Sequence, residues 1–123
     1  MSRLVLIIDD DVIERELLQR CLAVAGYRVL TAPGGEEGMA LAREHRPDLI
    51  VLDVVMPGMN GFQTCRGLRA LPETADTPVL MLTSKDQAAD RFWADEVGVS
   101  AYLTKPVDVT DLLATARGLL SPQ

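Results

Sequence analysis

Five short, mostly apolar runs divide the sequence, and each is followed by polar or turn-forming residues and then by a segment with helical periodicity. Apolar runs this short, bounded by turn formers, are typical of buried strands in a parallel sheet. Strands that alternate with helices predict a parallel sheet covered by helices on both faces through right-handed crossovers. The predicted strands are residues 4–8, 28–32, 48–53, 79–82 and 101–104.

Helix boundaries are also marked in the sequence. Asp11, with Glu14 three residues later, has the spacing of a helix N-terminal cap, and Gly26 is placed to end that helix. Further helices are expected before Pro47, around residues 62–71 and from about 86 to 97. The apolar residues of the first helix recur at helical spacing at Ile13, Leu17, Leu18, Cys21 and Leu22. Those of the last helix are Val109, Leu112, Leu113, Ala116 and Leu120.

Composition limits the class of protein. A length of 123 residues predicts one domain, with a core large enough to fold without disulfides. The net charge of −6 repels nucleic acid phosphates, so direct binding to DNA or RNA is disfavoured. Cys21 and Cys65 lack metal-ligand spacing and are expected to be buried free thiols. No run has the length of a membrane span or a signal-peptide core, which predicts a cytoplasmic protein without membrane insertion.

Chemically active side chains follow the predicted strands at their carboxyl ends. Asp9 and Asp10 follow the first strand, Asp53 ends the third, Thr83 follows the fourth and Lys105 the fifth. In parallel sheets these ends meet at one edge, where ligands bind at the reversal of strand order. Converging carboxylates repel one another unless they share protons or bind a cation, which indicates a hard divalent metal ion with oxygen ligands. A carboxylate beside Mg²⁺ and an ammonium can attack phosphorus, and the product is an aspartyl phosphate.

At these positions the whole chain resembles the receiver domain of two-component response regulators, the CheY-like family. The resemblance implies a flavodoxin-like fold of five strands in the order 2-1-3-4-5 with five helices. It also implies one receiver domain over residues 1–123 with no output domain. The matching residues are Asp9-Asp10, Asp53 with Met56-Pro57 and Gly61 behind it, Thr83, and Tyr102 before Lys105-Pro106.

The resemblance assigns roles at the acidic pocket. It implies that Asp53 accepts a phosphoryl group from a sensor histidine kinase. Asp10, Asp53 and the backbone carbonyl of Val55 are expected to hold Mg²⁺, and Asp9 is expected to act mainly through water. On this basis the protein is a phosphoacceptor switch with self-catalysed phosphotransfer and autodephosphorylation, rather than an enzyme.

The remaining roles concern the switch. Thr83 and Lys105 are expected to contact the phosphoryl group, and Tyr102 to change its rotamer when the switch closes. The Lys105-Pro106 bond is expected to be cis, which proline permits at modest cost. Output is expected through a partner protein on the face formed by the last two helices and the fifth strand. The receiver itself is expected to be a monomer or a weak dimer.

A finer resemblance links the chain to stand-alone receivers of type IV pilus systems, the twitching-motility PilG/PilH kind. It is carried by residues 83–87, Trp93 and residues 102–107. The chain departs from flagellar CheY at Val55, where that protein has a polar side chain, and at Lys85, where an acid is expected. A role in pilus-based motility or chemotaxis is therefore favoured over a flagellar one.

Three alternatives compete with this interpretation. A haloacid-dehalogenase-type phosphatase also uses an aspartate at a strand end, but it needs a longer chain and leaves Asp53 unexplained. A flavodoxin-like flavin module needs a phosphate-binding loop where this chain has Asp9, Asp10 and Asp11. A receiver-shaped interaction module that is never phosphorylated is the third alternative, and the complete pocket argues against it.

Overall fold

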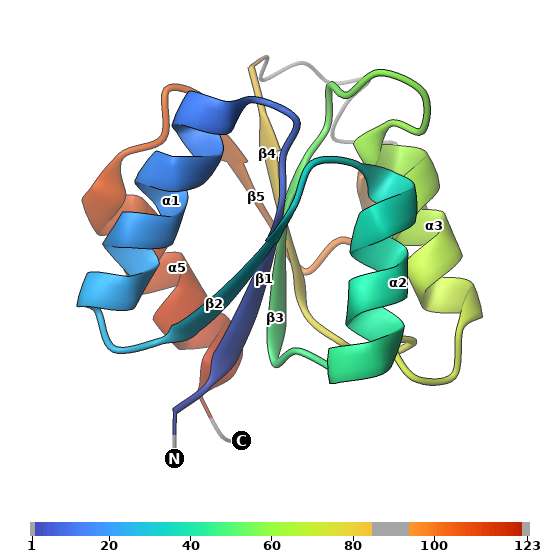
Figure 1. The fold of residues 1–123 in the computed structure, drawn as a ribbon, viewed down its shortest axis with the longest axis horizontal. Helices are drawn as coiled ribbons and strands as arrows, with labels where there is room; N and C mark the ends of the chain where they lie inside the picture. Colours follow the sequence, from blue (N-terminus) through green and yellow to red (C-terminus); the bar gives the residue numbers. More distant parts are fainter. Residues whose placement is uncertain (1, 85–93, 122–123) are drawn as a thin grey trace.

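The computed structural model describes residues 2–84 and 94–121. Its centre is a parallel sheet in which the strands pair in the order β2-β1-β3-β4-β5 (Figure 1). The predicted fold class and strand order are thus confirmed. The strands are β1 (Leu4–Ile8), β2 (Arg28–Ala32), β3 (Leu49–Asp53), β4 (Val79–Thr83) and β5 (Ala101–Thr104).

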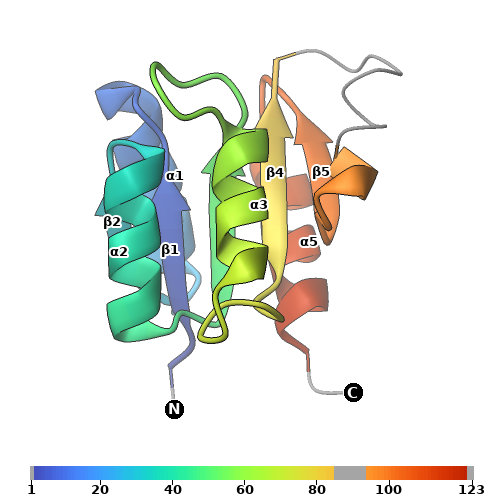
Figure 2. The ribbon, with the colours of Figure 1, turned by 90° about the vertical axis from the view of Figure 1, so that its right-hand side faces the viewer.

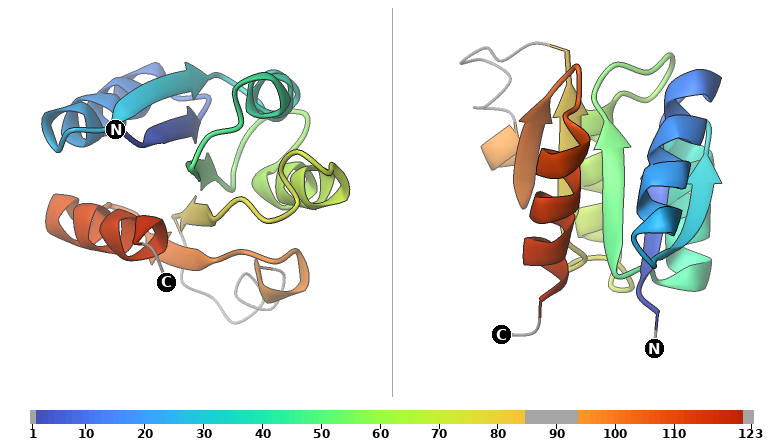
Figure 3. Two further views of the ribbon diagram at one scale, coloured as in Figure 1. Left: turned by 90° about the horizontal axis from the view of Figure 1, so that it is seen from below. Right: turned by 90° about the vertical axis from the view of Figure 1, so that its left-hand side faces the viewer.

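Helices cover both faces of this sheet. Helices α1 (Val12–Val24) and α5 (Val109–Leu120) lie side by side on one face (Figure 3). Helices α2 (Gly35–His45) and α3 (Gly61–Ala70) lie on the other (Figure 2). The helix expected over residues 86–97 falls largely outside the described residues, as do Lys85 and Trp93, but residues 94–96 are helical.

The helix ends have local causes that the sequence indicated. The Asp11 carboxylate accepts hydrogen bonds from the N–H groups of Ile13 and Glu14, at 2.9 and 3.2 Å, and so caps α1. Gly26 follows the end of α1 with a φ of 103°, a conformation that favours glycine. Helix α2 ends at His45, before Pro47, as expected.

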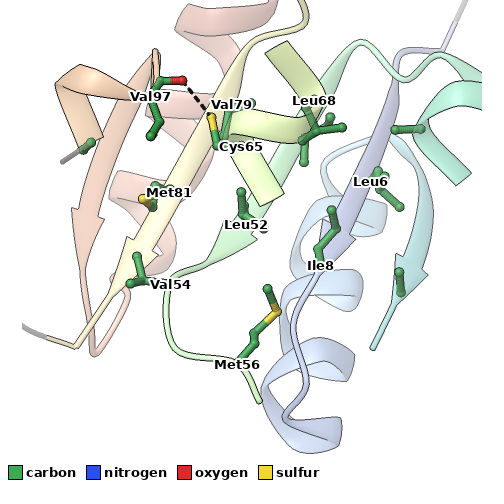
Figure 4. Close-up of a cluster of buried hydrophobic side chains, with 14 residues drawn as sticks. Leu6, Ile8, Leu52, Val54, Met56, Cys65, Leu68, Val79, Met81 and Val97 are labelled. Carbon is green, nitrogen blue, oxygen red and sulfur yellow. Dashed lines mark hydrogen bonds between the residues drawn. The ribbon is translucent and has the colours of Figure 1, made fainter. Parts of the chain in front are cut away.

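Alternation along the strands creates two hydrophobic cores. In β3, Ile50 and Leu52 pack beneath α2 and α3, whereas Leu49 and Val51 pack beneath α1 and α5. Figure 4 shows the first core, where the Cys65 thiol donates a hydrogen bond to the Val97 carbonyl oxygen at 3.3 Å. All residues of β3 and β4 are buried, so the middle of the sheet is a rigid base for the side chains at its carboxyl edge.

The apolar faces of α1 and α5 are only partly buried, and the prediction that both cysteines are buried was wrong for Cys21. Leu18 and Leu22 of α1 are buried, but Ile13 and Leu17 are 80% and 58% exposed. On α5, Val109 is likewise 45% exposed. The apolar stripe of each helix is wider than the part of the helix that packs on the sheet, so the residues at the edge of the stripe remain exposed to solvent. Cys21 lies at that edge and is only half-buried, unlike the buried Cys65.

Candidate functional site

The acid pair after β1 contains one buried and one exposed carboxylate. Asp9 is 1% exposed, and its Oδ1 accepts a hydrogen bond from the N–H of Asp11 at 2.9 Å. Its backbone is fixed on both sides, because its N–H donates to Ala32 O and its carbonyl accepts from Arg15 Nη1. Asp10 is exposed. The Oδ2 atom of Asp9 is buried and has no hydrogen-bond partner among the described residues.

Asp53 ends β3 and is 4% exposed, so its carboxylate lies at the floor of the site. The chain behind it turns tightly, with the Gly61 N–H donating to Val54 O at 2.9 Å. A Cβ on Gly61 would overlap the Asp53 carbonyl oxygen and come within 2.8 Å of the Val54 Cα. Glycine at this position therefore permits the close approach of α3 to the end of β3.

The acids fit a divalent metal ion. Asp9, Asp10 and Asp53 each offer a carboxylate oxygen, and these oxygens lie within 4.8 Å of one another. Burial raises the pKa of Asp9 to about 7, and the negative charges of Glu14 and Asp53 also raise it. The hydrogen bond from the Asp11 N–H and the positive charge of Lys105 lower this pKa, but by less. A buried oxygen with no partner in the described part of the chain, on a carboxyl whose pKa burial raises, suits a site that takes a cation. Hard oxygen donors of this kind suit Mg²⁺.

Lys105 supplies the positive charge on the other side of Asp53. Its Nζ donates to Asp53 Oδ1 and to Glu14 Oε2, each at 2.9 Å. Burial lowers the pKa of Lys105, but the hydrogen bonds and charges of Asp53 and Glu14 outweigh it, so the pKa is raised. The Lys105-Pro106 bond is cis, as predicted.

Thr83 and Tyr102 lie on the opposite face of the sheet from Asp53. Thr83 is 2% exposed and follows Met81 in the alternation of β4, on the side of α2 and α3. Tyr102 is opposite Met81 in the register and packs against the same core. The two predicted switch residues therefore share a face on neighbouring strands, and Thr83 lies two positions beyond the partner of Tyr102 in the register.

Comparison with known proteins agrees with this geometry. The family model of the response regulator receiver domain matches residues 5–117. The chain belongs to this family. It is 44% identical over 95% of its length to protein PilH from Pseudomonas aeruginosa, and covers 97% of that protein. It is 47% identical to the transcriptional regulator RpaA from Synechocystis, but spans only 48% of that longer protein.

Solved structures carry the same fold. The chemotaxis protein CheY4 from Vibrio cholerae superposes with a TM-score of 0.94 at 35% identity, and the match covers 98% of this chain and all of that one. The receiver assignment and the CheY-like fold expected from the sequence are thus confirmed. Among the described residues, helices long and apolar enough to cross a membrane are absent.

Two features near the receiver site escaped the sequence-based prediction. Glu14 was interpreted only as a helix-cap residue, yet it binds the ammonium of Lys105. An apolar groove of about 330 Å³ runs beside that pair, between α1 and the start of α5. Its apolar lining includes Ile13, Leu17 and Val107. The only sequence signal for the groove was the apolar stripe on α1, which contains more residues than can pack against the sheet at once.

Val55 lies just beyond the floor of the site. Val55 is 67% exposed, so it is an apolar residue on the surface two positions after Asp53. Lys85, the other position that departs from flagellar CheY, lies outside the described residues. The metal contact expected from the Val55 carbonyl stays a prediction.

Proposed function

We propose that this receiver accepts a phosphoryl group on Asp53 from a histidine kinase, with Mg²⁺ bound by the neighbouring acids, and signals through a partner protein. The observation that carries the proposal is the placement of Asp53. Its buried carboxylate lies between the acid cluster with Asp9 and Asp10 and the Lys105 ammonium, 2.9 Å away. A nucleophile flanked by a cation site and an ammonium suits phosphoryl transfer.

The chemistry follows from the residues around Asp53. One carboxylate oxygen attacks phosphorus, an O–P bond forms, and the N–P bond of the donor phosphohistidine breaks to release the imidazole. Mg²⁺ held by Asp10, Asp53 and the Val55 carbonyl, with Asp9 acting through water, would neutralise charge on the transferred oxygens. The buried floor at Asp53 and Asp9 limits access of water to the reacting carboxylate.

Lys105, Thr83 and Tyr102 have complementary roles in this proposal. Lys105 contacts the phosphoryl oxygens once they are attached, because its ammonium already binds Asp53 Oδ1. Thr83 supplies a hydroxyl donor from the end of β4. Tyr102, on the same face as Thr83, then changes rotamer and carries the signal to the surface of β5.

The output and setting are part of the same proposal. The target protein binds the face formed by β5, α5 and the helix that includes residues 94–96. The 44% identity to PilH and the motif resemblance to twitching-motility receivers support a role in type IV pilus behaviour, in the cytoplasm. The net charge of −6 argues against direct nucleic acid binding. Such a receiver acts as a monomer or a weak dimer.

Acetyl phosphate tests the central step without a kinase. With Mg²⁺ it should add one phosphoryl mass to the protein, and the adduct should be labile to base. Asp53→Asn should abolish the adduct, whereas Asp76→Asn, at an exposed position, should leave it unchanged.

Two results would contradict the proposal. An adduct of equal yield in Asp53→Asn would place the phosphate elsewhere. The absence of any adduct in the wild type, from acetyl phosphate and from histidine kinases alike, would favour the interaction module that is never phosphorylated.

A further inference from the structure

Glu14 ties the first turn of α1 to the phosphorylation site. Its Oε2 lies 2.9 Å from Lys105 Nζ, the same distance that separates this nitrogen from Asp53 Oδ1. The side chains are 23% exposed for Glu14, 20% for Lys105 and 5% for Asp53, so water screens this trio only partly. One ammonium is thus shared between a helix and the phosphoacceptor.

We propose that Glu14 is a positioning residue that competes with the Asp53 site for the ammonium of Lys105, and thereby opposes phosphorylation of Asp53. The inference rests on the proposed function. It adds a residue of α1 that sets how readily the phosphoryl group is accepted and kept.

The charge balance of the site supports this competition. Glu14 and Asp53 bind Lys105 directly, Asp9 and Asp10 cluster with Asp53, and a phosphoryl group would add further negative charge to Asp53. The bond to Glu14 uses one of the three N–H donors of the lysine and draws the ammonium toward α1. Without the charge of Glu14, the full ammonium is available to the phosphoryl oxygens, and one source of repulsion is removed.

A purely structural role for Glu14 makes the opposite prediction. If the carboxylate only held Lys105 in place, its removal would loosen the lysine and slow phosphorylation. Two variants separate these roles. Glu14→Gln keeps an acceptor oxygen for the ammonium but removes the charge, whereas Glu14→Ala removes both.

The experiment measures the phosphorylation rate with acetyl phosphate at saturating Mg²⁺, so that metal affinity does not limit the rate. Glu14→Gln and Glu14→Ala should both be phosphorylated faster than the wild type, by about fivefold for loss of one nearby, partly screened charge. Glu16→Gln is the matched control, because it removes the same charge from an exposed position of α1 and should leave the rate unchanged.

A spectroscopic measurement supplies a second readout. On phosphorylation, the wild-type amides of residues 12–15 should shift, because Lys105 leaves Glu14 for the phosphoryl oxygens. In Glu14→Gln this shift should fall by about half or more, since a neutral amide holds the ammonium more weakly. A residue that merely supports the fold would leave this shift unaltered.

The outcomes are distinct. If the wild type is phosphorylated on Asp53 and Glu14→Gln is phosphorylated at the same rate, the inference is wrong and the proposed function stands. Slower phosphorylation in Glu14→Ala, with no gain in Glu14→Gln, also overturns it in favour of a holding role. If the wild type is never phosphorylated, the proposed function fails and this inference fails with it.

Discussion

Because Asp9 is buried, we expect pH and Mg²⁺ to change the free energy of unfolding of this protein. Burial raises the pKa of Asp9 to about 7 in the folded protein, against the ordinary aspartate value of 3.8, which represents the unfolded chain. Between these values the folded state binds more protons than the unfolded state, so this group contributes stability at low pH that is lost as pH rises through 7. The linkage relation gives a loss of roughly 3 kcal/mol between pH 5 and pH 8.

The Asp9→Asn variant isolates this effect. An asparagine stays neutral, and its Oδ1 can still accept the hydrogen bond from the Asp11 N–H. In EDTA the variant should be more stable than the wild type at both pH values, because the unfolded wild-type carboxyl is already ionised at pH 5, and its advantage should grow by roughly 3 kcal/mol between pH 5 and pH 8. Urea unfolding at both pH values gives the two differences. Asp76→Asn removes an exposed charge and should change stability by no more than about 0.5 kcal/mol.

Mg²⁺ should narrow the difference between variant and wild type at pH 8. An ion that binds only the folded state adds about 2.7 kcal/mol at a concentration of 100 Kd, and the acid cluster of the wild type should gain most of this. Asp9→Asn should gain much less, because a ligand charge is missing. The reasoning is refuted if the difference between variant and wild type is the same at pH 5 and pH 8 in EDTA.

Two further predictions concern the phosphorylated protein, and a third concerns the packing behind Asp53. Lys105→Ala should accept phosphate more slowly and should lose the amide changes near Tyr102; changes as large as in the wild type would contradict the coupling role. Val55→Asn should shorten the lifetime of the phosphorylated protein by about tenfold, because an amide can orient the attacking water and valine cannot. Phosphate loss that is equal or slower in the variant would show that this side chain does not position the water. Gly61→Ala should lower the free energy of unfolding by about 2 kcal/mol through overlap with the end of β3. Gly118→Ala, on open helix surface, should be neutral or stabilising, and equal losses in both would refute the packing argument.

Much of the fold could be predicted because its signals are local. The apolar run that ends in Asp53 indicates both a buried strand and the position of its last residue. Asp11 and Gly26 mark the two ends of α1 by short-range hydrogen bonding and backbone conformation. Once the strands are parallel, their carboxyl ends must share an edge, so the acid cluster follows from topology alone.

The features that were missed depend on contacts between distant segments. Glu14 and Lys105 are separated by 91 positions in the chain, and their pairing depends on how α1 packs beside the start of α5. From the sequence, Glu14 has a complete local explanation as a residue of the capping turn. The exposure of Ile13 has the same origin, since periodicity shows that a stripe is apolar but not how much of it the neighbouring elements cover.

The alternation of strand side chains divides the site between the two faces of the sheet. Asp53 continues the β3 series that packs beneath α1 and α5, whereas Tyr102 belongs to the opposite face. In the proposed mechanism, a signal from Asp53 to Tyr102 therefore has to cross the sheet, in which every residue of β3 and β4 is buried. Lys105 provides a crossing point, because its ammonium binds Asp53 while its N–H donates to the Thr83 carbonyl oxygen at 2.6 Å. A shift of this lysine toward a phosphoryl group would thus displace the end of β4, which is the strand next to Tyr102.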